Sequence, residues 1–139
     1  MSRGWFPIRR NILKDPHWLE RPFTRGKAKL DLALLAEYEN TEATARGGKK
    51  IPLRRGQLFT SINWLAERWG WHRNKVRRFL DMLAENKEDL YAIEREIMKA
   101  SKLNPKENPE ALGTKITFLN YSILNDTQLS LPEDMEDEL

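Results

Sequence analysis

The sequence predicts an α+β fold that is mainly helical and carries a small antiparallel β-sheet. Apolar residues recur at helical spacing in two short segments, residues 62–68 and 72–85, with Gly70 between them. Segments rich in β-branched and aromatic residues lie before and after this pair. Two short amphipathic helices joined by a tight turn form a helix-turn-helix unit. The expected architecture is therefore a winged helix-turn-helix with a small antiparallel β-sheet.

Each helix of the expected pair has an apolar stripe along one face. Ser61 supplies a side-chain oxygen that can cap the first helix. The stripe of the first helix holds Ile62, Leu65, Ala66 and Trp69, and that of the second holds Val76, Phe79, Leu80 and Leu83. Trp64 projects off the first stripe. Two interpretations of it stay open, an exposed side chain that contacts a partner and one that packs on the N-terminal segment.

The residues before the pair predict two further helical segments. A helical turn is expected over residues 10–14, and it ends near Asp15 because Pro16 disfavours helix at the residue before it. Thr24 is the expected N-cap of a helix over residues 25–38, in which Leu residues follow helical spacing.

A loop and a hairpin are expected between that helix and the helix pair. Residues 39–49 have the composition of a mobile loop. Residues 50–53 are expected to form a strand that returns through a turn at 54–57 into a second strand over residues 58–60.

The segment after the pair does not commit to one structure. Residues 88–101 fit a helix by local propensity, whereas a winged helix needs a strand there. Whether residues 86–113 form a β wing or an inserted helix therefore stays open. Residues 114–121 are β-branched and aromatic and form the clearest expected strand.

Three regions of the chain are expected. Residues 1–22 form an N-terminal segment that packs on the domain, and residues 23–125 form the winged helix-turn-helix domain. Residues 126–139 form an acidic tail that is disordered or serves as a linker.

The net charge of +3 hides a strong asymmetry along the chain. Residues 49–80 hold nine Lys or Arg against a single Glu, whereas residues 126–139 hold six acids and no base. A basic body suits a polyanionic partner such as nucleic acid. A solvated surface of mixed charge is the alternative interpretation of the same composition, so the placement of the charges has to decide between the two.

The second helix of the pair is expected to present a basic face to solvent. From Trp69 to Leu80 there are four bases and no acid, and at ~100° per residue most of them lie away from the apolar stripe. Arg forks onto guanine, Asn pairs with adenine and Lys holds phosphate. The expected DNA contacts of this helix are therefore His72, Arg73, Asn74, Lys75, Arg77 and Arg78.

A second basic group lies in the expected hairpin before the helix pair. The group contains Lys49, Lys50, Arg54 and Arg55. The last three are further expected DNA contacts. The alternative for this group is a turn that only keeps the surface soluble. The same alternative is favoured for an N-terminal cluster made of Arg9, Arg10 and Lys14.

The composition argues against an enzyme, a metal site and a resident cofactor. The chain has no cysteine and only two histidines, so zinc and thiol chemistry lack their usual ligands. Residues 47–50 lack the leading glycine and the hydroxyl residue of a phosphate-binding loop. No apolar run approaches the ~20 residues that cross a membrane. We expect an intracellular, cytoplasmic protein with no membrane partner.

A longer stretch resembles a known family. Residues 55–83, RGQLFTSINWLAERWGWHRNKVRRFLDML, resemble the N-terminal winged-helix domain of phage replisome-organiser proteins, which are related to the bacterial primosome protein DnaD. The opening GWFPIRRNILKDPHW and the strand followed by Asn120 and Tyr121 are similar to the same family, so the resemblance covers about residues 4–125. One departure is His72, at a position where similar sequences carry Ser or Thr.

The resemblance implies a role in starting phage DNA replication, by origin binding or helicase recruitment, in the cytoplasm of a bacterial or phage-infected host cell. Its implied partners are double-stranded DNA, with single-stranded DNA left open, further copies of the chain, and a replicative helicase or its loader. Two alternatives remain: a non-enzymatic oligomerisation or protein-interaction module of a primosome, and a helix-turn-helix transcriptional regulator.

Overall fold

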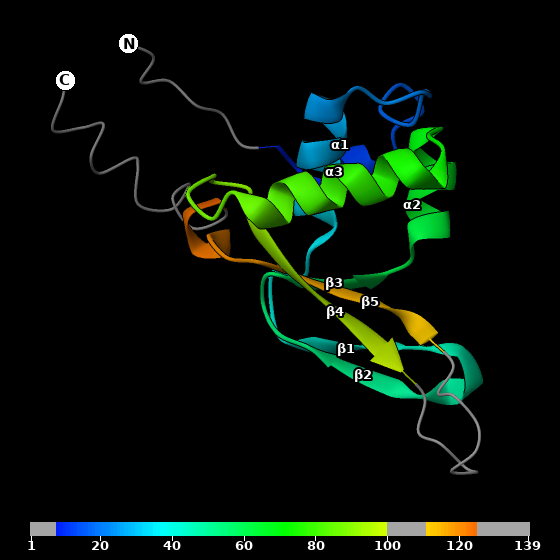
Figure 1. The fold of residues 1–139 in the computed structure, drawn as a ribbon, viewed down its shortest axis with the longest axis vertical. Coiled ribbons are helices and arrows are strands. Elements are labelled where there is room, and N and C mark those ends of the chain that lie inside the picture. The colour runs from blue at the N-terminus through cyan, green and yellow to red at the C-terminus, as the bar shows by residue number, and fades with distance from the viewer. Residues whose placement is uncertain (1–7, 100–110, 125–139) are drawn as a thin grey trace, which may run out of the picture.

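The structure of the chain is a computed structural model that describes residues 8–99 and 111–124. Helices and strands are mixed in an α+β fold with small antiparallel sheets (Figure 1). The helices are α1 (Arg25–Leu35), α2 (Ile62–Trp69) and α3 (Arg73–Glu85), with short 3-10 helices η1 (Arg10–Lys14) and η2 (Arg46–Gly48). The strands are β1 (Thr41–Thr44), β2 (Lys50–Leu53), β3 (Gln57–Thr60), β4 (Ile93–Lys99) and β5 (Ala111–Phe118).

The strands form two separate antiparallel sheets. The larger sheet has the order β3-β5-β4, and Ile116 of β5 lies opposite Leu58 of β3 and Arg95 of β4. The smaller sheet pairs β1 with β2. The helices gather toward one end of the long axis, and the β1–β2 hairpin lies toward the other (Figure 1).

The main core lies where the helices meet the three-stranded sheet. Its aromatic centre holds Trp69, Trp71 and Phe79, whose rings meet edge to face with centroids 5.0 to 5.7 Å apart. Leu32 of α1 and Ile116 of β5 are completely buried in the same cluster. The predicted stripes of the helix pair therefore face one shared core.

The residues that cap α1 and α2 are those that the sequence predicts. The Thr24 hydroxyl accepts a hydrogen bond from Lys27 N at 3.1 Å, and the Ser61 hydroxyl accepts one from Trp64 N at 3.1 Å, which confirms both predicted N-caps. Gly70 ends α2 with φ 69° and ψ 33°, a left-handed conformation that favours glycine. A Cβ on Gly70 would also come within 2.8 Å of Arg21 Cβ, so the turn before α3 is closed to larger residues.

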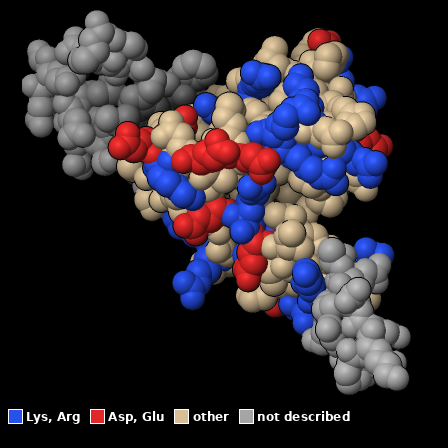
Figure 2. Space-filling view, viewed as in Figure 1, with Lys and Arg blue, Asp and Glu red and all other residues tan. Residues whose placement is uncertain are grey.

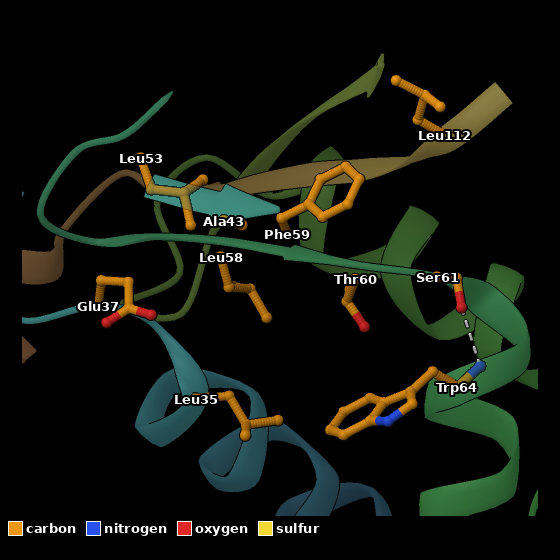
Figure 3. Close-up of a pocket in the computed structure, with 10 residues that line it drawn as sticks. All are labelled: Leu35, Glu37, Ala43, Leu53, Leu58, Phe59, Thr60, Ser61, Trp64 and Leu112. Carbon is orange, nitrogen blue, oxygen red and sulfur yellow. Dashed lines mark hydrogen bonds between the residues drawn. The ribbon is translucent and has the colours of Figure 1, made fainter. Parts of the chain in front are cut away.

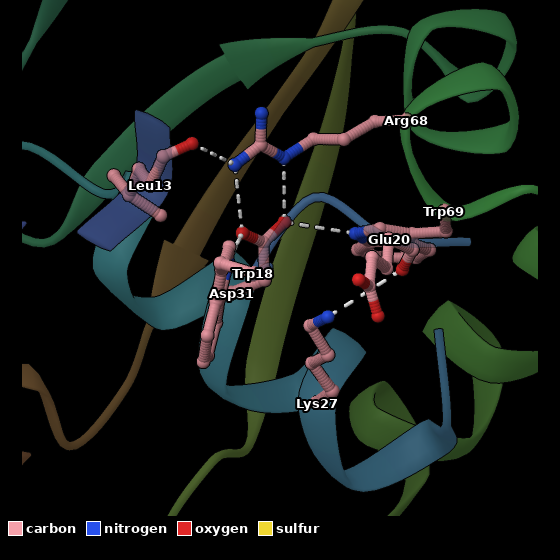
Figure 4. A network of polar contacts seen from close by, with 7 residues as sticks. All are labelled: Leu13, Trp18, Glu20, Lys27, Asp31, Arg68 and Trp69. Carbon is pink, nitrogen blue, oxygen red and sulfur yellow. Dashed lines mark hydrogen bonds and ion pairs between the residues drawn. The ribbon is translucent and has the colours of Figure 1, made fainter. Parts of the chain in front are cut away.

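Asp31 of α1 is a buried carboxylate at the centre of a polar network (Figure 4). Arg68 of α2 donates to it twice, from Nε at 2.8 Å and from Nη2 at 2.9 Å. The indole nitrogens of Trp18 and Trp69 donate to it at 2.8 and 2.9 Å. Arg68 also donates to the carbonyl oxygen of Leu13 at 3.2 Å, so the network joins residues 13–18 to α1 and α2.

The expected loop at residues 39–49 is wrong in part. It contains β1 and η2, and β1 pairs with β2 with Thr41 opposite Leu53. The prediction that residues 50–53 and 58–60 pair as one hairpin is also wrong, because β3 pairs with β5. β1 carries no apolar alternation beyond Ala43, so nothing in its own sequence marks it as a strand.

The first long helix ends earlier than expected, at Leu35 instead of near Tyr38. The backbone of Glu37 is bonded elsewhere, since its N–H donates to Gln57 O at 2.9 Å and its carbonyl oxygen accepts from Gly56 N at 2.7 Å. Pairing with the residues around β3 thus overrides the helical propensity of the segment.

The ambiguity after α3 is settled over residues 93–99, which form β4 and pair with β5. The expected strand at 114–121 is confirmed over residues 114–118, since the observed strand begins at Ala111 and ends at Phe118. Residues 100–110 of the segment that stayed open and the expected acidic tail at 126–139 lie outside the described residues.

A second, smaller core lies between the β1–β2 hairpin and the larger sheet. Ala45, Ile51 and Leu53 are buried there, at 6%, 1% and 4% exposure. Phe59, Met98 and Leu112 of the larger sheet pack against them. The β1–β2 hairpin is therefore fastened to the far ends of β4 and β5. None of the helices in residues 8–99 and 111–124 has both the length and the apolar composition needed to cross a membrane.

The Asp31 network predicts a large stability effect. We expect Asp31→Asn to lower the free energy of unfolding by about 3–5 kcal/mol, because the largely buried Arg68 side chain loses its counter-ion. Asp81→Asn is the matched control. Its ion pair with Arg95 is exposed on the aspartate side, and its loss is expected to cost at most about 1 kcal/mol. Urea unfolding of both variants measures the difference, and equal losses would contradict the role given to Asp31.

Candidate nucleic-acid interface

One face of α3 is anchored in the core and fixes the direction of the other. Val76, Phe79, Leu80 and Leu83 are 0 to 4% exposed and pack in the main cluster. Four of the predicted DNA contacts are exposed on the opposite face: Arg73, Asn74, Arg77 and Arg78. The helix thus has one apolar side and one polar, basic side, which is the division that a groove-binding helix needs.

The two halves of α3 differ in charge. Lys and Arg side chains gather over the half that adjoins α2, and Asp and Glu side chains gather over the other half (Figure 2). The acidic half contains Asp81 and Glu85, both exposed. A phosphate backbone would be attracted to the N-terminal half of α3 and repelled from its C-terminal half.

The exposed polar side chains of α3 make few hydrogen bonds or ion pairs with other described residues. Arg77 Nη1 donates to Asn74 Oδ1 at 3.2 Å across one turn of the helix. Within residues 8–99 and 111–124, Arg73 and Arg78 take part in no hydrogen bond or ion pair. Their guanidinium donors can therefore bind a ligand without first leaving a protein partner.

Lys75 differs from its neighbours. It is half-buried, and its Nζ lies 4.3 Å from the centroid of the Trp71 ring. A cation over an aromatic face gains electrostatic stabilisation. Lys75 thus points toward the turn between α2 and α3. To contact a ligand, its ammonium group would have to leave the ring or reach past it.

His72 is the N-cap of α3. Its Nδ1 accepts a hydrogen bond from Asn74 N at 3.1 Å, and its backbone is extended, as an N-cap residue requires. The imidazole therefore takes the place of the Ser or Thr hydroxyl expected at this position. It lies exposed beside Arg73 at the start of the basic half.

The basic group that was predicted before the helix pair, Lys50, Arg54 and Arg55, does not form one site with α3. Lys50 lies in the β1–β2 hairpin, where its Nζ donates to Thr44 Oγ1 at 2.9 Å. Arg54 is exposed in the turn between β2 and β3. Arg55 Nη1 donates to the carbonyl oxygen of Tyr38 at 3.0 Å, and its guanidinium carbon lies 5.3 Å from the centroid of the Tyr121 ring. The contacts of Arg55 are therefore structural.

Arg10 of the N-terminal cluster is also held in place. Its Nη2 donates to the Tyr121 hydroxyl at 2.6 Å. Burial raises the pKa of the Tyr121 phenol, while the charges of Arg10 and Arg55 oppose that rise. Arg9 and Lys14 of the same cluster are exposed.

The β4 strand carries mixed charge. Its exposed residues include Glu94, Arg95 and Glu96. Arg95 Nη1 forms an ion pair with Asp81 Oδ1 of α3 at 2.8 Å. The pair connects the strand to the acidic half of α3. Over the described part of β4 the charges alternate in sign, so this strand lacks the basic bias of α3.

An apolar groove lies on another part of the molecule, between the end of α1, β3 and the start of α2 (Figure 3). It encloses about 340 Å³ and is lined mainly by Leu35, Leu58, Phe59, Thr60, Trp64 and Leu112. Trp64 is 45% exposed, and Arg68 lies 5.4 Å from its ring. Thr60 Oγ1 is buried and has no hydrogen-bond partner among the described residues.

No group of three or more metal-ligating side chains occurs in the described ranges, 8–99 and 111–124. Comparisons of the chain with protein-family models, with curated proteins and with solved structures found no match. The resemblance carried by residues 55–83 therefore stays a prediction.

The cap of α3 gives a testable stability effect. We expect His72→Ala to lower the free energy of unfolding by about 0.5–2 kcal/mol, because Asn74 N–H loses its acceptor. His72→Ser restores a short acceptor and is expected to unfold at nearly the same urea concentration as the unaltered chain. An Ala variant as stable as the Ser variant would show that the imidazole does not cap the helix.

Proposed function

We propose that the chain is a DNA-binding protein with a winged helix-turn-helix fold. The elements α1, β3, α2, α3, β4 and β5 follow in the order of such a fold, and the sheet order β3-β5-β4 places the last strand between the other two. The β1–β2 hairpin is then an insertion between α1 and β3. In this interpretation α3 is the recognition helix, and β4 with β5 is the wing.

The observation that carries the proposal is the exposed basic half of α3. Arg73, Arg77 and Arg78 point away from the core beside Asn74, with no acid before Asp81. Arginine and asparagine are the side chains that pair in two-pronged fashion with guanine and adenine in the major groove. A helix that enters the groove by its N-terminal residues brings this set to the bases first.

Duplex DNA fits this surface better than single strands. The major groove is about 12 Å wide and admits an α-helix. Proteins that hold single strands stack bases on exposed aromatic rings beside a basic groove. The exposed face of α3 carries no aromatic residue, and Trp64 lies by the apolar groove.

The cellular role that we propose is the initiation of phage DNA replication, by origin binding or helicase recruitment. It rests on the resemblance of residues 55–83 to replisome organisers, and so do the proposed helicase or loader partner and the self-association. A preference for one short palindrome would favour a transcriptional regulator instead, since symmetric dimers read paired half-sites.

The groove beside Trp64 favours a second candidate function, a protein-interaction module. Large apolar side chains that remain exposed around a concave surface are typical of protein contacts. Trp64 is 45% exposed at the edge of this groove. Self-association through this surface is compatible with DNA binding by α3, because the two surfaces use different residues.

The first test concerns α3. We expect Arg77→Ala together with Arg78→Ala to weaken binding to a random duplex at least about tenfold, because two cations leave the surface that meets the DNA. The slope of log affinity against log salt is expected to fall by about one unit for each phosphate that the variant no longer neutralises. A mobility-shift titration at two salt concentrations measures both effects.

The matched control is Arg9→Ala together with Lys14→Ala, which removes the same charge from exposed residues of η1 and its cap. This control is expected to retain most of the affinity. Unchanged affinity in the α3 variant, or an equal loss in the control, would contradict α3 as the binding helix.

The second test concerns the groove. If copies of the chain associate through it, the mean mass in light scattering rises with protein concentration, and Trp64→Ala abolishes that rise. The substitution removes an exposed ring and leaves the buried cores intact. A strict monomer over the whole concentration range would exclude self-association by this surface.

A further inference from the structure

The β1–β2 hairpin, residues 41–53, is an addition to the helix-turn-helix core. It forms a sheet of its own, and none of its residues belongs to the main core. Its buried residues Ala45, Ile51 and Leu53 belong to the second core. The fold around α2 and α3 therefore does not require the hairpin, and its purpose needs a separate explanation.

The hairpin is held firmly against the larger sheet. An isolated two-stranded hairpin is marginally stable in water. Here Ile51 is 1% exposed, and Phe59, Met98 and Leu112 pack against its cluster. The hairpin thus extends the far ends of β4 and β5 as one body, and its tip has a defined position.

The hairpin tip, residues 46–50, is basic and exposed. It holds Arg46, Lys49 and Lys50 and no acid. Gly47 and Gly48 have φ values of 78° and 81°, and no atom of residues 8–99 or 111–124 lies within 4 Å of a Cβ placed on either. Because glycine has no side chain, a ligand can approach the backbone of this tip closely, beside its cations.

The tip and the basic half of α3 lie on the same side of the molecule. In Figure 1 the start of α3 and the turn of the β1–β2 hairpin both lie toward the right of the view, with the larger sheet between them. Both surfaces are positive, whereas the opposite end of α3 carries Asp81 and Glu85. One polyanion that runs along this side would meet two separate sets of cations.

We propose that the hairpin tip is a second DNA contact, which grips the phosphate backbone of the duplex bound by α3. The inference rests on the proposed function of α3 and adds the hairpin to it. The tip contains Lys, Arg and Gly and no acid. Lysine, arginine and backbone N–H groups are common donors to phosphate oxygens, so we assign its contacts to the DNA backbone. Lys50 retains two ammonium hydrogens for such a contact beyond the one given to Thr44.

The test is a salt titration of duplex binding by the full chain. Arg46→Gln, Lys49→Gln and Lys50→Gln together are expected to reduce the slope of log affinity against log salt by about 2–3 units, at about 0.9 per phosphate contact. A control variant removes three exposed cations elsewhere: Arg9→Gln, Lys14→Gln and Arg25→Gln. We expect the control to keep nearly the full slope.

A second measurement locates the tip on the DNA. Because the chain has no cysteine, Lys49→Cys creates a unique thiol for an iron–EDTA cleavage reagent. We expect backbone cleavage beside the segment that α3 protects, on the same duplex. Cleavage at the same place is expected when the base sequence under the tip is changed.

The outcomes separate the two proposals. The hairpin contact would be overturned if the tip variant kept its slope and the labelled Lys49→Cys variant cleaved no DNA. If the α3 variant lost binding in the same experiments, the proposal for α3 would stand. A tip variant whose slope falls no more than that of the control would also overturn it. A chain that binds no duplex at any salt concentration would overturn both.

Discussion

The buried carboxylate of Asp31 is the interaction on which the placement of the helix pair depends. It accepts four hydrogen bonds, two from Arg68 and one each from the indoles of Trp18 and Trp69. A carboxylate without solvent is costly unless its oxygens are satisfied. The N-terminal segment, α1 and α2 therefore fit together in the one arrangement that brings all of these donors to Asp31.

This constraint reaches the candidate interface through a short chain of contacts. Trp69 donates to Asp31 and also packs edge to face on Trp71 and Phe79, so the network and the aromatic cluster share a residue. Gly70 then turns the chain sharply into α3, whose apolar side rests on the same rings. The basic side of α3 is left facing solvent. The ion pair between Asp81 and Arg95 fastens the far end of the helix to β4.

Local patterns predicted the helix pair, its caps and the exposed face of α3, because periodicity and capping depend on neighbouring residues. The pairing of β1 with β2 was missed, since Thr41–Thr44 lacks the apolar alternation that marks a strand. β4 contains good helix formers, and only its pairing with β5 makes it a strand. In the site, the sign of the charge on α3 could be predicted. The aromatic partners of Lys75 and Arg55 could not, because Trp71 and Tyr121 reach them only in the folded chain.

The central claim is that the N-terminal half of α3 meets duplex DNA. Titrating the isotope-labelled chain with a short duplex, and following its backbone amide resonances, tests this claim most directly. The account predicts that the largest shifts fall on residues 72–78, with smaller ones at residues 46–50, and that the resonances around Trp64 stay unchanged. Shifts confined to the groove beside Trp64, or no shifts at all, would contradict it.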